Sequence, residues 1–246
     1  ELTPSYSKTS SYDLFGQTGI GQFMGWRDWA SNSDFDTAVS TADASNVRSS
    51  NMISYYTPNF SGLTAGLGYG FDEQTTGKAG RYVGGYVAYD NGPLSLAASY
   101  DQRDLLVNGL VAGSAVLDRD TFTLGGSYNL NVVKLNAIVQ QSKYKALGES
   151  EKVNAYALGV SAPVGAGEVK LQYALYDNKL IESKAHQLSL GYVHNLSKRT
   201  AVYGTVSYMD NKDDSNLGLA AKNLKTAGPG FGESQTGVQV GVRHSF

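Results

Sequence analysis

Cysteine is absent from this 246-residue chain, which also has few histidines (three), few prolines (five) and only 17% charged residues. Without cysteine, a disulfide scaffold, thiol catalysis and Cys-ligated zinc or iron–sulfur sites are excluded. No window approaches the ~18 consecutive apolar residues that a membrane-spanning helix requires, which excludes a helical membrane protein. The formal charge is −2, and the scattered Lys and Arg residues form no basic stripe, so we expect no nucleic-acid partner.

The few histidines and the many glycines form no catalytic motif. His186 and His194 lie about 26 Å apart along an extended strand at ~3.3 Å per residue, so they cannot bind one metal ion. Neither has a serine motif of the kind that hydrolases use. The glycine-rich segment 66–70 lies inside an alternating strand with no helix after it, which excludes a dinucleotide site. We predict no enzyme activity, no cofactor and no metal.

From about residue 48 onward, the dominant hydrophobic period is two, which is the period of a strand. Large apolar side chains at alternate positions oppose small or polar ones. The pattern predicts eleven strands, at residues 49–57, 63–71, 81–90, 94–102, 120–130, 133–144, 152–162, 168–177, 185–196, 200–210 and 234–246. Most exceed the ~5–6 residues of an average globular strand and match the ~9–11 residues of a strand tilted across a bilayer.

The connections between these strands alternate strictly between short and long. The short turns are 58–62, 91–93, 131–132, 163–167 and 197–199, and the long links are 72–80, 103–119, 145–151, 178–184 and 211–233. This alternation is typical of outer-membrane barrels, and no repeat indicates a propeller. The last strand ends on Phe246, which resembles the assembly signal of such barrels. We therefore predict an all-β, antiparallel up-and-down transmembrane barrel, in contact with lipid in the outer membrane of a Gram-negative bacterium.

Residues 1–47 do not follow the strand pattern, although they contain both tryptophans of the chain. We expect this segment to fold into the barrel as a constriction loop, with residues 48–246 forming a single barrel domain. The loop carries a net charge of −4 and the remainder +2. By alternation the lumen receives four basic side chains, Arg48, Lys134, Lys170 and Arg243. An acidic loop facing a basic wall would set a transverse field across the opening.

Several segments resemble the general porins of β-proteobacterial outer membranes, and most closely their anion-selective members. The most specific segments are YYTPNFSG, HNLSKRTAVYG and the terminal GVRHSF. The resemblance implies sixteen strands, a homotrimer and a third external loop folded inward, which would be residues 1–47. Eleven strands of sixteen leave five to be supplied before residue 1, by the same polypeptide or by a separate chain. It also implies that Arg48 lines the eyelet; Arg27 is a weaker candidate, with Asp13 and Asp28 as counter-charges.

The sequence thus predicts a passive diffusion channel for small hydrophilic solutes, with small anions favoured by the charge of the lumen wall. The alternative is a substrate-specific channel or an adhesive surface barrel whose long loops bind a ligand or a host partner. An open lumen with ohmic current distinguishes a porin from an adhesin, which would tolerate a plugged one.

Overall fold

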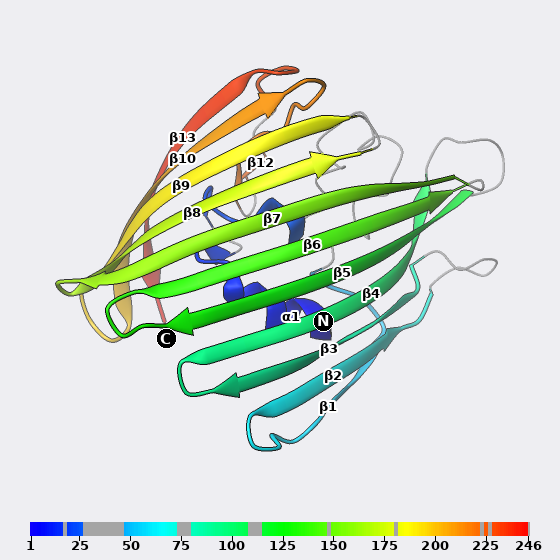
Figure 1. Cartoon of the computed structure of the whole chain (residues 1–246), viewed down its shortest axis with the longest axis horizontal. Helices are drawn as coiled ribbons and strands as arrows, with labels where there is room; N and C mark the ends of the chain where they lie inside the picture. The colour runs from blue at the N-terminus through cyan, green and yellow to red at the C-terminus, as the bar shows by residue number, and fades with distance from the viewer. Residues whose placement is uncertain are drawn as a thin grey trace.

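A computed structural model describes residues 1–16, 19–26, 47–72, 80–107, 115–146, 149–179, 182–221, 224–225 and 228–245. Its main feature is one eleven-stranded sheet in which each strand pairs antiparallel with its neighbours in the chain (Figure 1). The strands are β1 (Met52–Tyr56), β2 (Leu63–Gly70), β3 (Tyr82–Asn91), β4 (Leu94–Val107), β5 (Ala115–Asn129), β6 (Lys134–Ala146), β7 (Glu149–Val164), β8 (Gly167–Asn178), β9 (Ser183–Asn195), β10 (Thr200–Lys212) and β13 (Ser234–His244). The predicted all-β, up-and-down antiparallel architecture is confirmed.

The largest difference from the predicted strand bounds lies at the link expected over residues 103–119. Strand β4 continues to Val107 and β5 begins at Ala115, with Arg103 opposite Arg119 and Asp104 opposite Asp118. These charged residues have no hydrophobic alternation, and for that reason the sequence pattern placed them in a loop. The backbone ladder does not depend on that alternation, so the strands extend beyond their apolar part.

The two faces of the sheet have opposite chemistry. Large apolar side chains on the outer face are exposed; Leu158 retains 66% and Val240 80% of its accessible surface. On the inner face, small and polar side chains such as Ala157, Ser189 and Ser207 are buried. A continuous apolar exterior of this extent requires an apolar environment rather than water.

The N-terminal segment lies on the concave side of the sheet (Figure 1). It contains a short helix, α1 (Pro4–Thr9), and two 3₁₀ turns, η1 (Ser10–Tyr12) and η3 (Met24–Trp26). Helix α1 begins with proline, whose fixed φ suits the first helical turn. The sequence predicted a non-strand segment here but not the helix. Among the described residues, no helix is both long and apolar enough to span a membrane.

The link before the last strand also folds against the inner face. It contains a small two-stranded ladder, β11 (Ala220–Ala221) and β12 (Leu224–Lys225), that the sequence did not predict. The Nδ2 atom of Asn211 donates hydrogen bonds to the carbonyl oxygens of Leu217 and Glu233. Leu217 and Leu219 are buried as a result.

In the described part of the chain the main sheet has two edges, β1 and β13. Strand β1 pairs with β2, and β13 pairs with β10. Their remaining main-chain groups are available for pairing with further strands.

Candidate functional site

Wall glycines let the N-terminal segment lie close against the sheet. The side chains of Tyr12, Leu14 and Phe15 face three glycines of the inner face, Gly125 on β5, Gly159 on β7 and Gly191 on β9. A Cβ atom at Gly191 would lie 2.6 Å from the ring of Phe15, too close for any larger residue. Part of the high glycine content is therefore explained by the close approach of this segment.

Side-chain amides of the wall hold the main chain of the same segment. Gln172 Oε1 accepts a hydrogen bond from the N–H of Leu14 (3.1 Å), and Gln239 Oε1 accepts one from Ile20 (3.0 Å). Gln187 Nε2 donates to the carbonyl of Ile20 (3.0 Å). Since a segment without regular structure leaves its main-chain groups unpaired, these glutamines satisfy groups that would otherwise be costly to bury.

Asp13 is the centre of a buried hydrogen-bond network. Its carboxylate accepts from the N–H groups of Phe23 (3.0 Å) and Phe15 (3.2 Å), and from Nε2 of Gln172 (3.2 Å). The residue is only 7% exposed. In this geometry the carboxylate folds residues 13–23 back on themselves, in addition to any effect of its charge on the lumen.

The helix end of the segment is fixed on β3 and β4. Ser5 Oγ donates to the carbonyl of Gly85 (3.1 Å), and Lys8 Nζ lies 2.6 Å from the carboxylate of Asp90. The hydroxyls of Tyr12 and Ser95 are 2.9 Å apart. Burial raises the pKa of the Tyr12 hydroxyl above its ordinary value, which keeps it neutral.

A cluster of basic side chains lies beside this helix on the inner wall. Arg103 and Arg119 are paired across β4 and β5, and each is only 2% exposed. The guanidinium of Arg103 stacks 5.2 Å from the ring centroid of Tyr82, and its Nη2 donates to the carbonyl of Arg48 (2.8 Å). The Tyr82 hydroxyl donates to the carboxylate of Asp101.

Two arginines and one carboxylate give this inner cluster a net positive charge. A separate pair, Arg81 and Asp104, is 2.8 Å apart and balances itself. Arg103 and Arg119 were not among the predicted site residues, because both lie at the ends of the expected link 103–119. One sequence feature could have indicated Arg103. Ser99, Asp101 and Arg103 are polar residues at every second position, which continues the strand period of two beyond the predicted end at residue 102.

The predicted lumen residues occupy different surroundings. Arg48 lies before β1, is exposed, and forms an isolated bridge with Leu2. Lys170 Nζ donates to the carbonyl of Leu14 (2.9 Å) and lies 3.4 Å from the carboxylate of Glu168. Lys134 begins β6 and is half-buried, whereas Arg243, near the end of β13, is exposed. Arg27, Asp28 and Phe246 lie outside the described residues.

Within the ranges that the structure describes, no three His, Cys, Asp or Glu side chains gather at a distance suited to a metal ion. The histidines instead pair with outer-face hydroxyls. His186 Nδ1 lies 2.6 Å from the Tyr173 hydroxyl, and His194 Nδ1 lies 3.2 Å from that of Tyr192.

Comparison with known proteins identifies the family to which this chain belongs. The model of Gram-negative porins matches residues 6–214. The chain belongs to the Gram-negative porin family. The porin is 57% identical over 252 residues to outer membrane porin protein 32 of Delftia acidovorans, covering 100% of this chain and 68% of that protein.

Solved porin structures agree with this assignment. The anion-selective porin from Comamonas acidovorans superposes with a TM-score of 0.90 at 55% identity, covering 100% of this chain and 72% of that one. OmpT of Vibrio cholerae in its trimer form gives a TM-score of 0.71 at 14% identity, over 99% and 74% of the two chains, which shows the fold alone. The chain is therefore an outer-membrane porin, a passive channel and not an enzyme.

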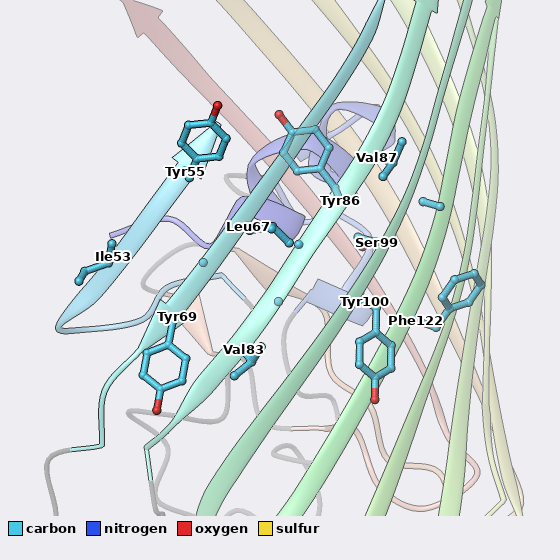
Figure 2. A pocket seen from close by; sticks show the side chains of 14 residues that line it. Ile53, Tyr55, Leu67, Tyr69, Val83, Tyr86, Val87, Ser99, Tyr100 and Phe122 are labelled. Carbon is cyan, nitrogen blue, oxygen red and sulfur yellow. The ribbon is translucent and has the colours of Figure 1, made fainter. Parts of the chain in front are cut away.

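The outer face of the porin carries a shallow groove of about 660 Å³ over β1 to β5. Figure 2 shows its lining side chains, including Ile53, Leu67, Tyr69, Val83 and Tyr100. No charged side chain lines the groove. Because this face is directed toward membrane lipid, the groove is a feature of the lipid-facing surface and not of the solute path.

Proposed function

We propose that this porin is an anion-selective diffusion channel. Small hydrophilic solutes cross its lumen down their gradient, and basic side chains on the wall favour small anions. The observation that carries the proposal is the inward-facing pair Arg103 and Arg119 beside Arg48. The description of the Comamonas acidovorans relative as anion-selective supports it.

The electrostatic reasoning rests on where the positive charge lies. Buried guanidinium groups in a low-dielectric wall are screened less by salt than exposed ones. Asp101 offsets one of the two arginine charges, since it interacts electrostatically with both. The remaining charge, together with exposed Arg48, raises the local anion concentration in the lumen.

In the proposed architecture, residues 1–47 form the constriction loop and residues 48–246 the barrel wall. The hydrogen bonds that join residues 13–24 to β8, β9 and β13 support this division, because they hold the segment across the concave face. The predicted counter-charges Asp13 and Asp28 would then lie on the loop side of the opening and the arginines on the wall side.

We further propose that the edges β1 and β13 join five more strands to close a sixteen-stranded barrel. An up-and-down barrel closes with an even strand number, and unpaired main-chain groups at an edge are costly in lipid. The proposed functional form is a homotrimer, supported by the trimer form of the Vibrio cholerae relative. Phe246 would act as the assembly signal of the last strand.

The test is the zero-current potential of the complete porin in a planar bilayer with a KCl gradient. Arg48→Glu should shift this potential toward the value for cations, because it reverses one charge at the opening. Arg199→Glu, in the exposed turn between β9 and β10, is the matched control and should shift it much less. Equal potentials for the wild type and Arg48→Glu would remove Arg48 from the selectivity mechanism.

A further inference from the structure

A second cavity lies inside the sheet, between the N-terminal segment and the wall. Its volume is about 380 Å³, within the range of small-ligand sites. Its lining side chains come from the inner segment and from β8, β9, β10 and β13, and include Leu14, Phe15, Lys170, Tyr203, Thr205 and Arg243. It is located toward the short-turn ends of these strands, which face the periplasm in this family.

The rings of Phe15 and Tyr203 belong to the lining of this cavity. Phe15 lies against Gly191, which pairs across the sheet with Thr205. Tyr203 pairs with Gly241, and a Cβ atom at that glycine would collide with the tyrosine ring. Both rings therefore occupy space that wall glycines leave open.

Arg243 supplies the charged part. It follows Gly241 by two residues on β13 and shares the inner face with it, so its side chain is a diagonal neighbour of Tyr203. The side chain is exposed, and within the described residues no ion pair or hydrogen bond engages its guanidinium. Lys170, by contrast, already binds the Leu14 carbonyl and lies near Glu168.

We propose that this cavity is a periplasmic-side binding site for small aromatic monocarboxylates. The carboxylate pairs with the guanidinium of Arg243, whose planar donors match it bidentately. The aromatic body lies against Phe15 and Tyr203, and the Thr205 hydroxyl completes the wall. Among the described residues Arg243 is the one lining guanidinium, Lys170 is already engaged, and the lining combines polar groups with the apolar surfaces of Leu14, Phe15 and Tyr203. One guanidinium beside aromatic rings favours an aromatic monocarboxylate over a dianion or phosphate. The site rests on the proposed anion channel, because the anion must enter the lumen to reach it.

Benzoate is the probe, added to the complete porin in planar bilayers from the short-turn side while chloride current is recorded. Benzoate should block with a saturable dose dependence. Acetate, which lacks the ring, and benzamide, which lacks the charge, should each need about tenfold higher concentrations. Equal block by benzoate and acetate would overturn the proposal.

Variants locate the block. Arg243→Gln should raise the half-blocking benzoate concentration at least about tenfold, and Tyr203→Leu about threefold. Lys134→Gln is the matched control, since it removes a lumen cation on β6 outside the cavity and should change that concentration less than about twofold. Folded barrels are verified for each variant by their heat-modifiable migration in electrophoresis.

The two proposals fail separately. A zero-current potential without anion preference contradicts the proposed function, whereas a block abolished by Arg243→Gln and kept in Lys134→Gln still supports the cavity. A block unchanged in both Arg243→Gln and Tyr203→Leu overturns the site, whatever the ion selectivity.

Discussion

The Nη2 atom of Arg103 donates a hydrogen bond across 2.8 Å to the main-chain carbonyl of Arg48. Arg103 comes from β4, whereas Arg48 precedes β1, one of the two edge strands of the sheet in the described part of the chain. The bond therefore connects a buried arginine of the wall with an exposed arginine that precedes β1. It fixes the main chain from which the Arg48 side chain extends.

This relationship predicts that Arg103 acts partly through Arg48. Arg103→Gln removes a charge and the charged donor, and should lower anion preference. Arg103→Lys keeps the positive charge, so it should retain more anion preference than Arg103→Gln. It loses the planar guanidinium that binds the Arg48 carbonyl, so the main chain at Arg48 is held less firmly. The zero-current potentials of the two variants in a KCl gradient measure this difference. A lower anion preference in Arg103→Lys than in Arg103→Gln would contradict a charge contribution from this position.

Removing the Asp13 carboxylate should loosen the inner segment. In Asp13→Ala the buried N–H of Phe23 loses its acceptor, which costs about 1–3 kcal/mol. We expect a lower melting temperature and noisier single-channel current. Asp72→Ala, an exposed carboxylate after β2, is the control. Identical channel noise in the two variants would show that Asp13 does not hold the segment in place.

Adjacent glycines on β5 provide a matched pair for the close approach of Tyr12. Gly125→Ala directs a methyl group into the Tyr12 ring, and overpacking of this kind costs roughly 1–3 kcal/mol. Gly126→Ala directs it outward, 2.9 Å from the flexible end of Leu96, which can move. Thermal unfolding and conductance should change more in Gly125→Ala; the opposite order would mean that the inner segment does not pack there.

If the outer surface faces lipid, the cost of an arginine substitution on it should depend on its depth in the membrane. Leu158 lies near the centre of β7, so Leu158→Arg should destabilise the folded barrel by about 2–4 kcal/mol. Val132 lies in the short turn between β5 and β6, near the interface, where the same change costs about 0–1 kcal/mol. Unfolding in lipid vesicles measures both, and equal costs would argue against the proposed membrane position.

The sequence predicted the strands well where one face meets lipid and the other does not. Every predicted strand overlaps an observed one. Lipid on one face of the sheet requires apolar side chains at alternate positions, and the same alternation specifies the strand register. The prediction failed at the loop ends of β4 and β5, where the charged residues Arg103, Asp104, Asp118 and Arg119 interrupt the alternation of apolar and polar side chains along the chain. There the strands are held by main-chain pairing, which has no side-chain signature.

The candidate site was predicted less completely for a related reason. The basic residues Lys134, Lys170 and Arg243 were predicted as lumen residues from alternation alone, and their role in the lumen stays a prediction. The roles of Gln172, Gln187 and Gln239 depend on which main-chain groups of residues 14–20 they meet. That contact joins residues more than 150 positions apart, and no local pattern reports it.

The most direct test of the anion-channel proposal is the zero-current potential of the unmodified, complete porin across a tenfold KCl gradient. The basic cluster of Arg48, Arg103 and Arg119 predicts a potential with the sign of chloride permeation. A potential near zero, or one with the sign of potassium permeation, would contradict the proposal.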